Sequence, residues 1–394
     1  MRDISFFCRK GTTRALRQSA IAMLFCGLTG SFLAGCSDGG GGVTIGESRA
    51  DALDLPQEDA GSDLNPRVSL ADLGERLFND TNLSSPAGQS CGSCHSEVDG
   101  FVDPDRENPS SLGANGGDFG NRNTPSLFYI NQIPDAQMVV RPHPATQVLQ
   151  EFEFGGFFID GRAKTLEEQA KLPLFNTVEM ALPSRLELVT RIQQSDYSEE
   201  FQAHFGEEVF DSAEKTLESV ASALTEFQRS DRFSPFNSKF DSVQRGESVF
   251  TESEARGEAL FNGQALCSVC HASPTQPELF SDLLYHNVGT PRNEKLLMDI
   301  GNPDFVDLGL GGITKDPADN GQFRTPVLRN VALTAPYMHN GVFGTLREVV
   351  EFYNSGTAPG EVPGANVPPF IGNLQLNETQ VDDLVAYMNT FTDL

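Results

Sequence analysis

The sequence predicts a mostly α-helical protein made of two similar domains with long ordered loops. Three observations support this fold class. Apolar residues recur at helical spacing in several segments, strand patterns are sparse, and one short motif occurs in each half of the chain, as GERLFN at 74–79 and GEALFN at 257–262. Each copy is followed by a Cys-x-x-Cys-His motif. The 394 residues are enough for two domains of ordinary size.

The N-terminus is typical of an exported bacterial lipoprotein. Five basic residues precede or flank the start of an apolar run over 20–34, which is short for a membrane span of about 20 residues. The run ends in LAGC at 33–36, which resembles a lipoprotein cleavage box; an uncleaved helix is the alternative. We therefore expect a signal peptide at 1–35 and a flexible tether at 36–66. A lipid on Cys36 would then hold the protein in the periplasm at a membrane, with the outer membrane expected.

The chain is strongly acidic, with a formal net charge of −27 at pH 7. This charge argues against nucleic acid and against anionic lipid surfaces as partners. It is compatible with a basic redox partner, and a solvated acidic surface explains it equally well.

The cysteine pattern points to haem chemistry. Of seven cysteines, three lie at or before residue 36 and the other four all belong to the two Cys-x-x-Cys-His motifs, so none remains for a disulfide. Such a motif attaches a c-type haem through two thioethers and supplies a His to the iron. A redox dithiol or a zinc site would need partners that this chain lacks. We expect two haem c groups, held by Cys91, Cys94 and His95 and by Cys267, Cys270 and His271.

Helical patterns surround both motifs. Before the first motif, residues at 3–4 spacing form an apolar stripe: Leu70, Leu73, Leu77 and Phe78. The last segment has a similar stripe, with Asn377 as its expected cap: Val381, Leu384, Val385, Met388 and Phe391. A helix, a haem loop and a closing helix form the cytochrome c arrangement. We expect two cytochrome c-like haem domains, at 67–235 and 236–394.

Four further stretches carry a family resemblance. They are RNTPSL at 122–127, FFIDGRAKTLEEQA at 157–170, FRTPVLRNVALTAPYMHNG at 323–341 and TLREVVEFYN at 345–354. Together with the two haem motifs, they show that the chain resembles the bacterial di-haem cytochrome c peroxidase and MauG family over nearly all of its mature length. The resemblance implies a high-potential electron-entry haem in the C-terminal domain. It also implies a peroxide-reacting haem in the N-terminal domain.

The first haem is expected to have an open iron. Peroxidase members of the family place a His from the loop after the first motif on the far side of the iron. That loop, 96–121, contains no His, Met or Tyr here. His143 falls outside the matching loop and is expected to be an ordinary loop residue. The first haem should therefore be five-coordinate on His95, as in MauG-like proteins.

Two polar residues match the family's distal pocket. Gln169 and Glu179 fall where the family has its distal glutamine and catalytic glutamate, with Pro173 expected to end the helix between them. A carboxylate beside bound peroxide can move a proton between the two oxygens, and an amide can hydrogen-bond the bound oxidant. Without the resemblance, each residue would be interpreted as a helix-surface side chain.

The second haem has two candidate sixth ligands. Met338 is one, because thioether ligation is common in electron-transfer cytochromes. The family resemblance instead favours Tyr353, since peroxidase members carry Met and MauG-type members carry Tyr at the matching position. An oxygen donor suits an iron that holds oxidising equivalents. The alternative for Tyr353 is a core aromatic.

The resemblance also implies a calcium ion between the haems. Its matching ligands are the side chain of Asn123 and the backbone carbonyls of Thr334 and Pro336. Hard oxygen donors of this kind suit Ca²⁺.

One position departs from the family pattern. Typical members have a Trp before Asp160 as an electron relay between the haems, whereas this chain has Ile159 and no Trp at all. Because Ile cannot be oxidised, the electron route must differ, or the haems must exchange electrons directly.

Two functions fit these observations. The first is reduction of hydrogen peroxide with electrons from a small periplasmic cytochrome c or copper protein. The alternative is a MauG-like enzyme that uses peroxide to oxidise residues of a partner protein. A pure electron carrier is disfavoured by the open first iron.

Overall fold

The computed structural model describes residues 69–142, 148–274, 276–356, 360–362 and 366–394. These residues belong to a compact unit that spans Leu64–Leu394. The predicted signal peptide, the tether with Cys36, and His143 lie outside the described residues. Among the residues that are described, none of the helices has the length and apolar character needed to cross a bilayer.

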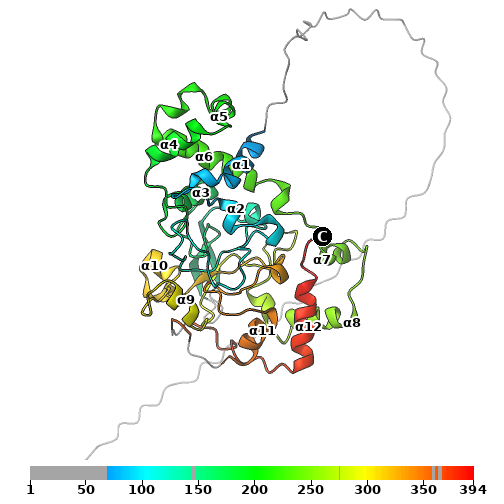
Figure 1. Cartoon of the computed structure of the whole chain (residues 1–394). Coiled ribbons are helices and arrows are strands. Elements are labelled where there is room, and N and C mark those ends of the chain that lie inside the picture. Colours follow the sequence, from blue (N-terminus) through cyan, green and yellow to red (C-terminus); the bar gives the residue numbers. More distant parts are fainter. Residues whose placement is uncertain (1–68, 143–147, 275, 357–359, 363–365) are drawn as a thin grey trace, which may run out of the picture. The chain divides into compact units, whose positions relative to one another are not determined.

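Helices dominate the described structure, which confirms the predicted fold class (Figure 1). The helices are α1 (Leu70–Asn79), α2 (Cys91–Cys94), α3 (Leu166–Phe175), α4 (Arg185–Gln194), α5 (Ser198–Phe205), α6 (Ala213–Gln228), α7 (Lys239–Gln244), α8 (Glu252–Phe261), α9 (Glu294–Asp299), α10 (Gly311–Thr314), α11 (Leu346–Ser355) and α12 (Glu378–Asn389). Two small antiparallel sheets accompany them. They pair β1 (Gln137–Pro142) with β2 (Leu149–Phe154) and β3 (Tyr285–His286) with β4 (Phe323–Arg324).

The helix before the first haem motif forms where the sequence predicts it. The Ser69 side chain accepts a hydrogen bond from the Asp72 N–H, and the Asp72 carboxylate accepts one from the Ser69 N–H, so both residues close a capping box at the start of α1. Leu73, Leu77 and Phe78 are buried, as the apolar stripe predicts. This face of α1 packs against α6, which is therefore the closing helix of the first half.

The second half repeats this arrangement with α8 and α12. Thr251 caps α8 and Asn377 caps α12, each through a capping box. Val381, Leu384 and Met388 are buried on the face of α12 predicted from the sequence. Figure 1 shows α8 beside α12, and the two helices pack against each other.

The close packing of two helices explains the glycine of the repeated motif. A Cβ atom at Gly74 would lie 2.0 Å from the carbonyl oxygen of Ala223 on α6. A Cβ atom at Gly257 would lie 2.0 Å from the carbonyl oxygen of Asp383 on α12. Any side chain would collide with backbone at these points, so glycine is what allows the two helices of each pair to cross closely.

The buried side chains form two hydrophobic clusters. The first cluster collects residues of α1, α3, α4 and α6, among them Leu73, Leu77, Leu166, Leu174, Leu188, Ile192, Leu217, Val220 and Leu224. The second collects residues of α8, α11 and α12, among them Phe261, Leu346, Val350, Val381, Leu384, Tyr387 and Phe391. Leu283 from the second half joins the first cluster. The boundary predicted between residues 235 and 236 stays a prediction.

Candidate haem sites and the region between them

The first haem motif is held by a short helix and a fixed imidazole. Cys91 and Cys94 are the two ends of α2, and both are free thiols. The Nδ1 atom of His95 lies 3.0 Å from the carbonyl oxygen of Phe101. Because a carbonyl oxygen only accepts, Nδ1 carries the proton and Nε2 keeps its lone pair for a metal. Burial lowers the pKa of His95, so the neutral ligand form is favoured.

The second motif has the same geometry. Cys267 lies in a 3₁₀ turn, Cys267–Val269, and Cys267 and Cys270 are free thiols. The Nδ1–H group of His271 donates to the carbonyl oxygen of Phe280 at 2.7 Å, and burial lowers the pKa of this imidazole. Two free thiols and a neutral imidazole with Nε2 available are the donor set that a c-type haem requires. Both motifs therefore fit a haem.

Phe101 and Phe280 are equivalent residues that the sequence did not reveal. Both have a left-handed backbone, with φ of 55° and 56°. Phe101 stacks on Phe233 at a ring-centroid distance of 4.4 Å, and Phe280 stacks on Phe391 at 3.8 Å. A left-handed conformation costs a bulky residue roughly 1–2 kcal/mol. In both halves it turns a carbonyl oxygen toward the imidazole, and the stacked ring holds the residue there.

Helix α3 carries Gln169, which is partly buried. The expectation that Pro173 ends this helix is wrong, because Pro173 lies inside α3 and the helix continues to Phe175. A proline has no backbone N–H, so one helical hydrogen bond is missing at Pro173. Only two residues of α3 follow it, and the helix therefore ends soon after the missing bond. The helix ends at Asn176, whose N–H bonds back to the Pro173 carbonyl oxygen at 3.3 Å.

Glu179 follows α3 in a turn that fixes its position. The Asn176 side-chain amide donates to Oε1 of Glu179 at 2.8 Å, and the Glu179 carbonyl oxygen accepts from the N–H of Ala114 at 2.8 Å. Burial raises the pKa of Glu179, while Asn176 and the charge of Arg162 oppose that rise. The carboxylate in turn makes a small contribution to the raised pKa of the Cys91 thiol in the first motif.

Helix α11 carries Tyr353. Thr345 caps the helix through a capping box with Glu348. Burial raises the pKa of Tyr353, and the thiols of Cys270 and Cys267 raise it further. Tyr353 is partly buried against the second hydrophobic cluster, and Cys267 of the second motif packs against the same cluster. Met338 lies in the loop before α11 with a φ of 70°.

Helices α3 and α11 are repeats of each other. Residues 157–175 and 337–355 align without a gap, and each stretch begins with a β-bridge, Phe157 to Ala163 and Tyr337 to Phe343. A threonine caps each helix, and each helix has ten residues. In this register Pro173 of α3 occupies the position of Tyr353 in α11. Proline has no atom that can bind iron, so α3 offers the first iron no ligand at the position where α11 has its tyrosine.

The region between the halves contains a reciprocal pair of backbone hydrogen bonds. The Asn123 N–H donates to the carbonyl oxygen of His339, and the Arg324 N–H donates to that of Ile159, each at 2.8 Å. The stretch Asn123-Thr124-Pro125 matches Arg324-Thr325-Pro326, so Asn123 is equivalent to Arg324. The repeat of 157–175 and 337–355 makes Ile159 equivalent to His339. Ile159, the residue in place of the family's Trp, therefore lies where the two halves meet.

A buried ion network crosses the same boundary. The Arg122 guanidinium binds both carboxylate oxygens of Asp307, at 2.5 and 2.7 Å, and an oxygen of Asp160 at 2.6 Å. Arg162 binds Asp160 at 3.0 Å. Asp160 and Asp307 are almost fully buried, so this network fixes the first half against the second.

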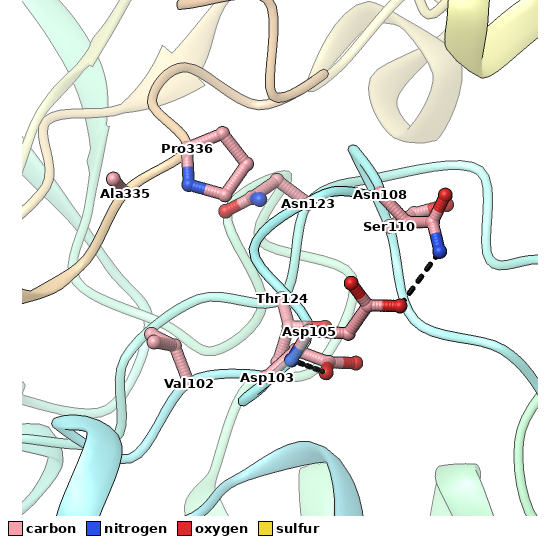
Figure 2. A pocket seen from close by; sticks show the side chains of 9 residues that line it. All are labelled: Val102, Asp103, Asp105, Asn108, Ser110, Asn123, Thr124, Ala335 and Pro336. Carbon is pink, nitrogen blue, oxygen red and sulfur yellow. Dashed lines mark hydrogen bonds between the residues drawn. The ribbon is translucent and has the colours of Figure 1, made fainter. Parts of the chain in front are cut away.

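A small cavity lies at the predicted calcium position (Figure 2). It encloses about 10 Å³, close to the space of one water-sized particle. The structure brings Asn123 and Pro336 to it but lines it with Ala335 in place of Thr334, the neighbouring residue. Sequence reasoning missed several lining residues with oxygen atoms: Asp103, Asp105, Asn108, Ser110 and Thr124. The Asn123 amide nitrogen donates to the Pro109 carbonyl oxygen at 3.2 Å, so its oxygen is free of that bond.

A second cluster of ligand-type atoms belongs to the haem region. Atoms of Cys270, Asp282 and His286 lie within 4.8 Å of one another, and His286 Nε2 is 2.9 Å from a carboxylate oxygen of Asp282. Because the sulfur of Cys270 belongs to the haem motif, this cluster is part of the second haem site.

Comparisons with known proteins agree with this geometry. A family model described as di-haem cytochrome c peroxidase matches residues 69–249. The methylamine utilization protein MauG of Paracoccus denitrificans is 40% identical over 361 residues, which cover 82% of this chain and 89% of that protein. The chain belongs to the di-haem cytochrome c peroxidase and MauG family.

Two further relatives of the di-haem family show its breadth. The cytochrome-c peroxidase IdrP1 of Pseudomonas sp. strain SCT is 29% identical over 348 residues, which cover 81% of this chain and 80% of that protein. The crystal structure of the diheme peroxidase BthA from Burkholderia thailandensis superimposes with a TM-score of 0.71 at 33% identity, covering 82% of this chain and 86% of that one. As a family member, the chain binds two haem c groups and is a haem-dependent oxidoreductase of the cytochrome c peroxidase type.

Proposed function

We propose that this protein reduces hydrogen peroxide at its N-terminal haem, with electrons that pass through its C-terminal haem. The observation that carries the proposal is the alignment of α3 with α11. In this alignment Pro173 occupies the position that Tyr353 has in α11. The loop at 96–121 supplies no His, Met or Tyr either. An iron held by His95 with an open opposite face can bind a small oxidant.

Glu179 and Gln169 are the proposed distal residues. A haem held by Cys91, Cys94 and His95 would supply the iron for peroxide binding and the electrons for its cleavage. Glu179 accepts the proton of the inner peroxide oxygen and returns it to the outer oxygen, which leaves as water. Asn176 holds the carboxylate for this step through its 2.8 Å hydrogen bond. Gln169 donates a hydrogen bond to the oxidant from α3.

Tyr353 is the proposed sixth ligand of the C-terminal haem. Its packing against the same hydrophobic cluster as Cys267 supports this role. The electron donor is proposed to be a small periplasmic cytochrome c or copper protein. A basic donor would be attracted by the net charge of −27.

A MauG-like reaction, in which peroxide is used to oxidise residues of a partner protein, is the second candidate. Tyr353 favours it, because MauG-type members carry Tyr at this position, and so does the 40% identity to the Paracoccus MauG protein. The fold is the same for both reactions, so the partner protein decides between them.

The cavity of Figure 2 is the proposed calcium site. Asn123 and Pro336 line this cavity and would offer an amide oxygen and a backbone carbonyl, and Thr334 directly precedes the lining residue Ala335. Asp103 and Asp105 add carboxylates that the family resemblance did not include. Oxygen donors with several carboxylates suit Ca²⁺.

Two measurements test the function. The oxidised protein should show one high-spin and one low-spin ferric haem, and it should reduce peroxide with electrons from reduced cytochrome c. Two fully low-spin six-coordinate haems would refute the open N-terminal iron. Peroxide consumption that requires a genetically neighbouring protein and is not supported by cytochrome c would favour the MauG-like reaction.

We also propose that the protein is a periplasmic lipoprotein attached through Cys36, because LAGC at 33–36 follows a basic and then apolar leader. In a bacterial host, Cys36→Ser should abolish the lipid modification detected by mass spectrometry of the N-terminal peptide. An unmodified wild-type N-terminus would refute this proposal.

A further inference from the structure

Arg324 is a buried cation to which no carboxylate of the described residues is bonded. Only 7% of its surface is exposed, and burial lowers the pKa of its guanidinium. Within the described part of the chain, its Nε and Nη1 atoms have no hydrogen-bond partner. An unpaired charge of this kind is costly inside a protein and is normally matched by an anion.

The other buried or near-buried cations of this boundary region are matched. Arg122 binds Asp307 and Asp160, and Arg329 binds both oxygens of Asp241 at 2.5 and 2.9 Å. Tyr285, which pairs with Arg324 across β3 and β4, is a neutral side chain whose hydroxyl donates to the Gly155 carbonyl oxygen. The protein therefore leaves Arg324 without the anion that the neighbouring arginines have.

The position of Arg324 connects it to the C-terminal haem motif. The next residue, Thr325, donates its hydroxyl hydrogen to a carboxylate oxygen of Asp282 at 2.8 Å. The Asp282 N–H donates to the carbonyl oxygen of Cys270 at 2.8 Å. On its other side, the Arg324 N–H reaches Ile159 in the first half. Arg324 thus lies between the second haem motif and the boundary of the two halves.

We propose that Arg324 binds a propionate of the C-terminal haem and raises the reduction potential of that haem. A haem brings two carboxylates, and one of them would give this guanidinium its missing anion through the unused Nε and Nη1 donors. A fixed positive charge beside the haem disfavours the ferric form more than the ferrous form, because the ferric form carries one more positive charge.

The internal repeat shows that the proposed effect of Arg324 applies to one haem and not to the other. Asn123 occupies the equivalent position in the first half and makes the equivalent backbone hydrogen bond, but its side chain is a neutral amide that lines the cavity of Figure 2. Only the C-terminal haem therefore has a permanent cation at this position. The difference raises the potential of the C-terminal haem relative to the N-terminal one.

The test is spectroelectrochemistry of the di-haem protein and of Arg324→Met and Arg324→Lys. In Arg324→Met we expect the ferric-to-ferrous ratio of the C-terminal haem, at fixed potential, to rise at least tenfold. That change lowers the midpoint by 59 mV for a one-electron couple. The lysine variant keeps the charge and should retain most of the wild-type potential. Arg245→Met is the matched control, since it removes the same charge from a half-exposed side chain that is paired with Glu247.

Two results would overturn the proposal. One is an unchanged C-terminal midpoint in Arg324→Met at full haem content, and the other is a shift confined to the N-terminal haem. If the methionine variant does not retain its haem, resonance Raman spectra of Arg324→Lys decide the question. The propionate bending mode should shift when the two-donor guanidinium is replaced by an ammonium, and an unshifted mode would show that Arg324 does not contact the propionate.

Discussion

Replacing Glu179 with Gln should remove the proton acceptor of the peroxide reaction and preserve its surroundings. The side-chain oxygen that accepts from Asn176 at 2.8 Å persists in glutamine, and the backbone bond from Ala114 to residue 179 does not involve the side chain. Glutamine has nearly the same volume as glutamate. The resting spectra of both haems should therefore stay similar to those of the wild type.

The expected loss of rate follows from the role of the carboxylate. Positioned general acid–base groups contribute roughly 10²–10⁴-fold, which corresponds to about 2.7–5.4 kcal/mol of activation free energy. Burial raises the pKa of Glu179, so the wild-type rate should fall as the pH drops toward that raised pKa and the carboxylate takes up a proton. The glutamine variant should lack this pH dependence because glutamine does not titrate.

Rapid mixing with hydrogen peroxide, followed by haem absorption, measures the rate directly. Glu167→Gln is the matched control, since Glu167 lies on α3 and its side chain pairs with Arg229 at 3.1 Å on the surface. The control should react at the wild-type rate. A Glu179→Gln protein that keeps both the wild-type rate and its pH profile would exclude Glu179 from the mechanism.

Three further predictions concern ligation, electron exchange and the cation site. Tyr353→Phe should perturb the low-spin haem spectrum and leave the high-spin one nearly unchanged, while Met338→Leu should alter neither; the reverse pattern would identify Met338 as the ligand. Ile159→Trp should change only the step after peroxide cleavage, in which the two haems share oxidising equivalents. If rapid-mixing spectra show that the wild type already shares them at full speed, no relay residue is needed. A chelator should remove one calcium per protein and slow turnover, and Asn123→Ala should weaken calcium binding at least tenfold by titration calorimetry; a calcium-free wild type by elemental analysis would refute the site.

The sequence predicted the helices that carry strong local signals. α1 and α12 appear where apolar stripes and capping residues place them, and the GExLFN repeat marks two equivalent helix crossings. The β1–β2 hairpin was not predicted. Its apolar residues Met138, Val140 and Leu149 are more than half exposed, so the segment lacks the one-sided burial pattern that identifies a strand.

The site was predictable only where a side chain itself performs the chemistry. The Cys and His residues of the haem motifs follow from spacing alone. The carbonyl oxygens of Phe101 and Phe280 do not, because a left-handed backbone at phenylalanine leaves no trace in residue type. The unpaired state of Arg324 was equally hidden, since it depends on which carboxylates the fold brings near it.

The environment of the motif cysteines bears on the order of events in maturation. Burial raises the pKa of Cys91 and of Cys267 to about 12, so in the folded chain almost none of either thiol is ionised at neutral pH. The thiolate is the reactive form of cysteine. We therefore expect the thioether bonds to form while the chain is still open, before α1 closes on α6 and α8 on α12.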